Sequence, residues 1–506
     1  MAFEATLTWL LQLSFGFFFF TFTALFFIFS ILGFFLKLKP CCSCEICQTF
    51  LTSSWTLEFN NLCDWYSHLL SKSSTGTIHV HVLGNVITAN PKNVEHMLKT
   101  RFDNYPKGKP FSAILGDLLG RGIFNADGDL WRFQRKMASL ELGSVSVRSY
   151  AFNIVTTEIE SRLIPLLSSV ADKGIDDSSG SLDLQDILRR FSFDSICRFS
   201  FGLDPGCLRL SLPISEFASA FDLASKLSAE RAITTSPMIW KLKRFFNLGS
   251  EKQLKQAIKS VHELAEEVIR QKRNNAVNDS SHDDLLSHFI CTTDDDVFLR
   301  DIVVSFLLAG RDTVASALTS FFWILSKNTH VIEKIREESD RVMGQETEKM
   351  VEFAQLRDMH YLQAAVHESM RLFPPVQFDS KFCEEDDVLA DGTFVARGTR
   401  VTYHPYAMGR MERIWGPDCL EFKPERWLRG GVFKQEDPFK YPVFQAGRRV
   451  CLGKEMAVVE MKTVALSLIR RFDIQVAMPG RAPTFMPGLT ATLRGGLPIV
   501  VRERKH

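Results

Sequence analysis

The chain has 506 residues, of which 45% are hydrophobic and 24% are charged, and its formal net charge is +1. These values are ordinary for a folded globular protein. A net charge so close to zero argues against a strongly basic surface for nucleic acid and against an acidic disordered tail, so we expect no nucleic acid among the partners.

The N-terminus is a long apolar segment. Residues 5–36 contain no Asp, Glu, Lys, Arg or His and are rich in Phe. A helix needs about 20 apolar residues to span a bilayer, whereas a cleaved signal peptide has an apolar run of only about 7–15. Lys37 and Lys39 follow the segment, and lysines favour the cytosolic side. We therefore expect a retained single-pass anchor over residues 1–36, with the remaining body in the cytosol. A buried core helix is the alternative.

Cysteines cluster directly after this segment. Cys41, Cys44 and Cys47 recur at CxxC spacing in the stretch CCSCEIC. In a reduced cytosolic protein they are either incidental free thiols or, beside a membrane, sites of palmitoylation. A zinc site is the third interpretation. Zinc needs a fourth ligand, and Cys42 and Cys63 are poor candidates for it.

A strand pair is expected next, over residues 76–91, GTIHVHVLGNVITANP. Apolar and polar residues alternate there with the period of a half-buried strand, and Gly84-Asn85 suits a hairpin turn. His79 and His81 therefore lie on one face of the expected strand. The pair is either part of the strand's solvent face or a metal site, and the alternation favours the solvent face.

The remaining chain is mostly helical by its hydrophobic pattern. Helical periodicity runs from residue 91 to about 375, and short strand-like runs return at 385–403. Polar stretches at 171–181 and 274–284 indicate surface loops. We therefore expect a mainly α fold with a smaller β-rich part. No stretch within the body resembles a linker, so we expect a connector over residues 37–60 and one domain over residues 61–506.

A helix of about thirty residues, 299–328, has charges at its centre. Arg311 and Asp312 each cost about 2.5–3.5 kcal/mol in mid-bilayer, so this helix should pass through a soluble domain instead. The two charges either form a buried ion pair or line a polar notch beside a reaction centre. Thr313 can bond back to a carbonyl one turn earlier and loosen the helix there.

Two further stretches carry charges at suggestive spacing. Glu368 and Arg371 lie three apart at the end of a helix that stops before two prolines, so they share one face and can pair. Arg426 follows in a loop, FKPERW. An exposed pair of this kind would contribute only about 0–1 kcal/mol.

The stretch FQAGRRVCLG, residues 444–453, places Cys451 at the start of the last long helix, which runs to about Phe472. The helix N-terminus and the neighbouring cations should lower the pKa of the thiol. The resulting thiolate could be a nucleophile or a metal ligand. No local protease signature surrounds Cys451. Ligation of haem iron explains the surroundings better, because glycines let the backbone pass close to a flat macrocycle and an arginine can pair with a propionate.

The loop Phe444-x-x-Gly447-x-Arg449-x-Cys451-x-Gly453 resembles the haem-binding loop of the cytochrome P-450 superfamily. Other motifs of that superfamily occur in its order along the chain, and the resemblance covers everything from about residue 60 to the end. These motifs are Trp131-x-x-x-Arg135, Ala309-Gly310-Arg311-Asp312-Thr313, Glu368-x-x-Arg371 and Pro424-Glu425-Arg426-Trp427.

The resemblance implies the cytochrome P-450 fold, with haem b as cofactor, and a role for each matched residue. Cys451 would be the axial thiolate on the haem iron, in a loop shaped by Phe444, Gly447 and Gly453. Trp131, Arg135 and Arg449 would hold the haem propionates. Asp312 and Thr313 would relay protons to bound dioxygen, and Glu368, Arg371 and Arg426 would form a structural triad under the haem.

A narrower resemblance suggests the substrate. FNADGDLWRFQRKMAS and EFKPERW are similar to the plant fatty-acid ω-hydroxylase group, and CEICQTFLTSSW and FPPVQFDSKF to its jasmonate-catabolic branch. This implies an NADPH- and O2-dependent monooxygenase in the endoplasmic reticulum membrane. It would receive electrons from NADPH-cytochrome P-450 reductase and oxidise the ω end of jasmonoyl-isoleucine or its 12-hydroxy form, to the alcohol and the carboxylate.

Several alternatives stay open. The substrate could be a free fatty acid, and the protein could be a haem-thiolate isomerase or dehydratase, or a haem sensor without turnover. Jasmonoyl-isoleucine and a free fatty acid each carry a carboxylate. Lys107, Lys109 and Arg121 are candidates to anchor it, unless they belong to a solvated loop.

The chain departs from the superfamily's pattern at three places. Val314 replaces a frequent Thr or Ser, and Arg448 replaces a frequent Pro in the cysteine loop. The proline-rich hinge usual after the anchor is missing. The first departure could alter the proton relay, the second the face offered to the reductase, and the third the orientation on the membrane.

Overall fold

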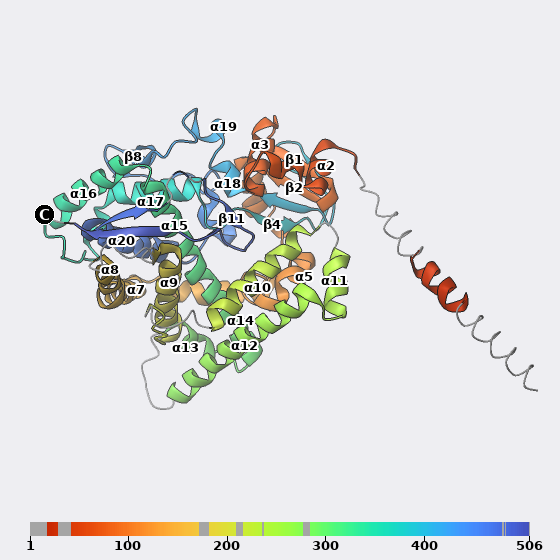
Figure 1. The fold of residues 1–506 in the computed structure, drawn as a ribbon, viewed down its shortest axis with the longest axis horizontal. Helices are drawn as coiled ribbons and strands as arrows, with labels where there is room; N and C mark the ends of the chain where they lie inside the picture. Colours follow the sequence, from red (N-terminus) through yellow and green to blue (C-terminus); the bar gives the residue numbers. More distant parts are fainter. Residues whose placement is uncertain are drawn as a thin grey trace, which may run out of the picture.

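The computed structural model describes residues 18–28, 42–171, 182–208, 216–234, 237–276, 284–477, 480 and 482–504. Residues 172–181 and 277–283 of the two predicted loops lie outside these residues, as do Cys41 and most of the expected anchor. Residues 274–276 are described and end a helix, so the prediction of a loop is wrong there. Figure 1 shows the main body, in which helices predominate. The expectation of a mainly α fold with a smaller β-rich part is therefore confirmed.

The helices form most of the described chain. Their bounds are α2 Glu45–Thr52, α3 Leu62–Lys72, α4 Pro91–Glu95, α5 Gly108–Leu119, α6 Gly128–Leu142, α7 Val145–Glu158, α8 Ile164–Ala171, α9 Leu184–Phe201, α10 Glu216–Ile233, α11 Pro237–Phe245, α12 Gly249–Ala276, α13 Leu285–Ile290, α14 Asp296–Leu307, α15 Thr313–Leu325, α16 Thr329–Met343, α17 His360–Leu372, α18 Pro405–Met408, α19 Glu412–Trp415 and α20 Lys454–Arg471.

The strands are short and group into small sheets. Their bounds are β1 Thr77–Val80, β2 Asn85–Thr88, β3 Leu182–Asp183, β4 Asp379–Phe382, β5 Asp387–Val388, β6 Phe394–Val395, β7 Arg400–Tyr403, β8 Leu428–Arg429, β9 Val432–Phe433, β10 Phe472–Val476, β11 Phe485–Met486, β12 Thr492–Leu493 and β13 Pro498–Glu503.

The largest sheet has the order β1-β2-β7-β4 and lies with α3 at one end of the body, opposite α16 (Figure 1). β1 and β2 pair antiparallel, with Ile78 opposite Ile87, and β2 pairs parallel with β7. The predicted hairpin is therefore present, but its turn is longer than expected. A 3-10 turn, η2 (His81–Leu83), precedes Gly84, so His81 lies in the turn and not on the strand face.

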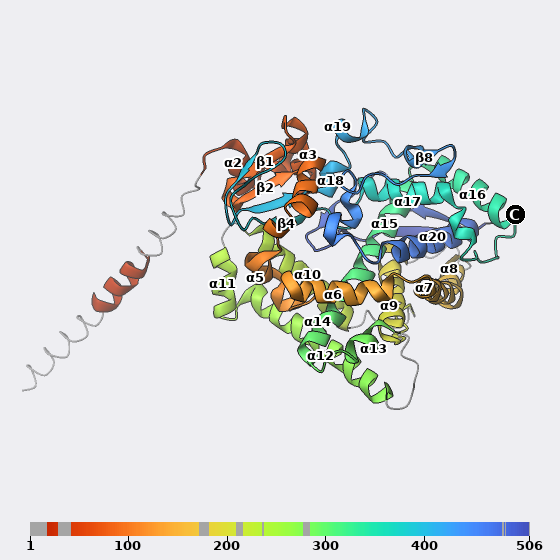
Figure 2. The same ribbon diagram turned by 180° about the vertical axis from the view of Figure 1, so that it is seen from behind.

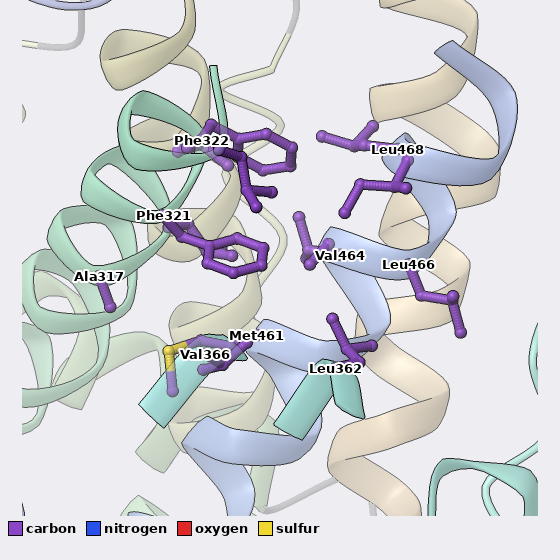
Figure 3. Packing of buried hydrophobic residues seen from close by; sticks show 14 of the residues in the cluster. Ala317, Phe321, Phe322, Leu362, Val366, Met461, Val464, Leu466 and Leu468 are labelled. Atoms are coloured by element: carbon purple, nitrogen blue, oxygen red, sulfur yellow. The ribbon is translucent and has the colours of Figure 1, made fainter. Parts of the chain in front are cut away.

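The main apolar core lies between α15, α17 and α20. Figure 3 shows side chains of the three helices meeting there: Ala317, Phe321 and Phe322 of α15, Leu362 and Val366 of α17, and Met461 and Val464 of α20.

The helix ends follow from local chemistry. The Asp295 carboxylate caps α14 by accepting the Phe298 N–H at 3.0 Å, and α17 ends just before the pair Pro374-Pro375.

The long helix with central charges runs through this core. It spans Asp296–Leu325 as α14, a π-helical segment η6 (Leu308–Asp312) and α15. It is long and apolar enough to cross a membrane, but 78% of its most apolar window is buried inside the protein. The helix therefore runs through the interior of the folded body, as predicted.

The described part of the N-terminal apolar segment is also helical. A helix runs over Phe18–Ile28, and Phe18, Phe20 and Phe27 are 74%, 73% and 66% exposed. Exposed phenylalanines on a helix suit a lipid environment and are consistent with the expected anchor. The other residues of the expected anchor lie outside the described part of the chain.

Candidate active site

The cysteine loop is held in a strained shape ahead of α20. The Cys451 N–H donates to the Phe444 carbonyl at 2.8 Å, and α20 begins three residues later, at Lys454. Gly447 has φ +59°, and a Cβ at this position would overlap the Leu98 carbonyl. Glycine is therefore required here, both for the backbone conformation and for the close approach of the neighbouring chain.

The Cys451 side chain is exposed, but the surrounding protein still desolvates it. Burial raises the pKa of the thiol. The Gly453 N–H, Arg135 and Lys454 oppose this effect but do not reverse it. The expectation of a lowered thiol pKa is therefore wrong, because desolvation outweighs the neighbouring positive charges. A bound metal cation would still deprotonate the thiol outright.

Trp131 and Arg135 lie one turn apart on α6, which crosses the body between the sheet and α7 (Figure 2). Arg135 donates to the Val450 carbonyl, next to Cys451. The Arg449 guanidinium carbon lies 4.6 Å from the Trp131 ring centroid, and its Nη2 donates to Asp127 Oδ1 at 2.6 Å. The fold thus brings the three predicted propionate-holding residues to the cysteine loop.

One donor in this group lacks an acceptor. Arg449 Nε is buried and has no hydrogen-bond partner among the residues that the structure describes. Burial also lowers the pKa of Arg449, although Asp127 and Asp379 partly offset this effect. A buried guanidinium N–H without an acceptor is expected to meet an anionic or polar group of a ligand.

The two charged residues of the central helix, Arg311 and Asp312, differ in their hydrogen bonding. Arg311 is buried and donates to Asp222 Oδ1 on α10 at 2.7 Å, with Asp312 Oδ1 at 3.2 Å. Asp312 Oδ1 accepts no hydrogen bond from the described residues, and burial raises the pKa of Asp312 despite Arg311. The interpretation as a buried ion pair is therefore confirmed for Arg311. The alternative, a polar notch beside a reaction centre, stays a prediction that the unused acceptor capacity of Asp312 supports.

Thr313 bonds back as expected, and the helix is loosened beside it. Its Oγ1 donates to the Ala309 carbonyl at 2.6 Å, and residues 308–312 form the π-helical segment. Such segments interrupt α-helices most often at functional sites. Gly310 in this segment packs so closely against Ile196 that a Cβ would overlap its side chain.

A small cavity separates the π-helical segment from α20. Gly310, Ser195, Met456 and Glu460 are among its lining residues. Glu460 Oε1 and Ser195 Oγ have no partner among the described residues, and burial raises the pKa of Glu460 to about 8. The sequence analysis did not identify Glu460. Its only signal was an acidic residue within the apolar pattern of the last helix.

Glu368 and Arg371 of the predicted triad are fully buried, and the Arg426 side chain is 11% exposed. Glu368 accepts from Arg371 Nε at 2.7 Å and Nη2 at 2.8 Å, and from Arg426 Nε at 3.3 Å. Trp427 Nε1 donates to the same carboxylate at 2.9 Å, and the Lys423 N–H at 3.0 Å. The Glu368–Arg371 pair is therefore buried, unlike the exposed pair that would contribute little to stability. It joins α17 to the loop that leads to Cys451.

The proposed carboxylate anchors are occupied or peripheral. Lys107 is buried and donates to Asp379 Oδ1 at 2.5 Å. Arg121 pairs with Asp295 at the surface, and Lys109 is exposed. Lys107 is therefore neither a free anchor nor part of a solvated loop, because its charge is used inside the fold. Arg448 is 57% exposed, and its guanidinium carbon lies 5.2 Å from the Phe102 ring centroid.

Comparison with known proteins identifies relatives over nearly the whole chain. The cytochrome P450 family model matches residues 70–499, a range that contains every residue of the candidate site. Cytochrome P450 94C1 of Arabidopsis thaliana is 60% identical over 502 residues, covering 98% of this chain and 100% of the relative. Cytochrome P450 94B1 of Arabidopsis thaliana is 46% identical, with 89% and 90% covered, and cytochrome P450 94A1 of Vicia sativa is 44% identical, with 89% and 88% covered.

Proposed function

Because this chain belongs to the cytochrome P450 family of haem monooxygenases, we propose that it oxidises the ω end of jasmonoyl-isoleucine or of its 12-hydroxy form. In the first step one oxygen atom of O2 enters the terminal C–H bond, and the other leaves as water. NADPH supplies the two electrons through NADPH-cytochrome P450 reductase. Two further rounds carry the alcohol to the carboxylate, which would inactivate the hormone.

The observation that carries the reaction class is the cysteine loop together with Trp131, Arg135 and Arg449. Family members bind haem b, which when bound supplies the iron that activates dioxygen. The exposed Cys451 thiol offers that iron a ligand, and the unpartnered Nε of Arg449 offers a propionate a donor. We propose that Trp131 and Arg135 hold the same acidic edge, and that Phe444, Gly447 and Gly453 keep the loop close to the macrocycle.

We assign proton handling to Asp312 and Thr313. Burial raises the pKa of Asp312, which favours the protonated carboxyl, and its Oδ1 accepts no hydrogen bond from the described residues. The Thr313 hydroxyl, now bonded to the Ala309 carbonyl, can rotate to donate elsewhere. Val314 is buried and carries no hydroxyl, so the relay has no second hydroxyl at this position. Glu368, Arg371 and Arg426 fix the loop and touch no substrate.

The chain is proposed to be anchored by residues 1–36 in the endoplasmic reticulum membrane, with residues 61–506 as the cytosolic catalytic domain after a connector over 37–60. The apolar helix Phe18–Ile28 supports the anchor. The exposed Arg448 adds positive charge to the face beside the cysteine loop, where an acidic reductase would dock.

The substrate assignment rests on the sequence resemblance and is tested by direct comparison. Microsomes containing the full chain and a plant reductase are given jasmonoyl-isoleucine, its 12-hydroxy form or lauric acid, and the products are measured by mass spectrometry. We expect kcat/KM to be at least about tenfold higher for a jasmonoyl-isoleucine substrate, a difference of about 1.4 kcal/mol in transition-state binding.

A reversed preference would identify a fatty-acid ω-hydroxylase, the second candidate. Product formed without NADPH would indicate an isomerase or dehydratase. A substrate-induced spectral shift without any product would indicate a haem sensor. Each of these three outcomes contradicts the proposed function.

A further inference from the structure

The structure brings three cysteines and a histidine together at the N-terminal edge of the body. The thiols are those of Cys42, Cys44 and Cys47, and the imidazole is that of His81. The ligand atoms of the four side chains all lie within 4.8 Å of one another. We propose that these four residues bind one zinc ion in a closed structural site.

The geometry is close to that of a tetrahedral zinc centre. Cys44 Sγ lies 4.0 Å from His81 Nδ1. With Zn–S bonds of about 2.3 Å and a Zn–N bond of about 2.0 Å, neighbouring ligand atoms in a tetrahedron are about 3.5–3.8 Å apart. Shortening of the longest separations, at most 4.8 Å, by about 1.0–1.3 Å therefore closes the cluster around the metal.

The backbone already supplies the hydrogen bonds that thiolate ligands accept. The Val82 N–H donates to Cys47 Sγ at 3.4 Å, and the Cys44 N–H donates to Cys42 Sγ at 3.3 Å. Bonds of this kind orient metal ligands and stabilise their charged form.

The donor set selects zinc. Three soft thiolates and one imidazole suit Zn²⁺ in four-coordinate structural sites, and four protein ligands leave no open position for catalysis. His81 completes the set from the η2 turn between β1 and β2. Cys63, the other cysteine considered as a ligand, is buried and donates to Gln377 Oε1 at 3.4 Å.

The competing interpretation, palmitoylation, fits the same cysteines less well. Cys47 is 0% exposed and accepts a backbone N–H, so an acyltransferase cannot reach it in the folded protein. A zinc ion would instead join the segment before α2 to the turn between β1 and β2. It would fix the start of the described body, directly after the expected anchor, to the largest sheet.

Metal analysis of the full chain tests this site. The protein is produced with zinc in the medium, purified with a tag that contains no histidine, and kept reduced. Zinc and iron are then measured together by mass spectrometry, with haem iron as the internal count of folded chains. We expect about one zinc per iron, and X-ray absorption at the zinc edge should show about three sulfur atoms near 2.3 Å and one nitrogen near 2.0 Å.

Two ligand variants and two matched controls locate the metal. Cys44→Ser and His81→Gln should each lower the zinc-to-iron ratio by at least about tenfold, since even outer-shell partners contribute about 10–100-fold to metal affinity. Cys291→Ser changes an exposed cysteine elsewhere, and His79→Gln changes the histidine whose ring centroid lies 5.5 Å from that of His81. Both controls should keep their zinc.

Three results would overturn the proposal. These are wild-type protein with full iron but no zinc, zinc retained by Cys44→Ser, and copper or an acyl thioester on these cysteines in place of zinc. If a ligand variant loses its iron as well, and so has not folded, the X-ray absorption of the wild-type protein decides alone.

Discussion

Replacement of Glu368 by Gln should destabilise the fold more than any single change at an exposed charge. The carboxylate is 0% exposed and receives donors from Arg371, Arg426, Trp427 and the Lys423 backbone. Glutamine keeps the shape, but it removes the negative charge and turns an NH2 group toward donors. Breaking a buried pair by removing one partner costs about 3–5 kcal/mol, which is a large part of a total stability of about 5–15 kcal/mol.

The assay is urea unfolding of the detergent-solubilised protein, followed by tryptophan fluorescence, with haem content measured in parallel. Glu425→Gln is the matched control, because Glu425 is 42% exposed, lies one residue before Arg426 and pairs with Lys334 at the surface at 2.7 Å. Its loss should cost no more than about 1 kcal/mol. If Glu368→Gln destabilises the protein no more than Glu425→Gln, the buried network does not hold the cysteine loop in place.

Three further changes test other parts of the site. Burial raises the pKa of Glu460 to about 8, so the native state holds a proton that the unfolded chain releases above about pH 4.5. The free energy of unfolding should therefore fall by about 1.4 kcal/mol per pH unit between pH 5 and 7, and Glu460→Gln should remove this fall. Parallel pH profiles of the variant and the wild type would contradict the prediction. Gly447→Ala should lose most of its bound haem, because the new Cβ would strain the backbone and overlap the Leu98 carbonyl. The control Gly392→Ala, at φ +88° with open space around it, should keep its haem. Equal haem content in the two variants would count against the overlap. Thr313→Val should lower the product formed per NADPH by at least about tenfold and raise the peroxide formed. The control Thr319→Val loses a similar hydrogen bond to a carbonyl, at 2.6 Å, and should change neither quantity. Unchanged coupling in Thr313→Val would show that Thr313 does not relay protons.

Local patterns were sufficient to predict the helices and the cysteine loop. The long helix was separable from a membrane span because two adjacent charges, Arg311 and Asp312, stand in its middle. Gly447 marked a close backbone approach, and the prolines after Arg371 marked a helix end. These features depend on residues that lie next to one another in the sequence, where propensity and steric rules act directly.

What the sequence could not reveal depends on distant contacts. The pKa of Cys451 depends on how much protein surrounds it, and the number of nearby cations did not predict this. Lys107 appeared to be a free cation in a loop, but Asp379, 272 residues later, occupies it. His81 meets Cys44 from 37 residues later in the chain, and it lies in a 3-10 turn of which the alternation of the strand gave no sign.

The central claim is that the Cys451 thiolate is the protein's ligand to haem iron. The most direct measurement is the absorption spectrum of the reduced carbon monoxide complex of the full chain, for the wild type, Cys451→Ser and the control Cys291→Ser. We predict that the red-shifted Soret band is present in the wild type and in Cys291→Ser and is lost in Cys451→Ser. A red-shifted band that survives in Cys451→Ser would show that another residue binds the iron.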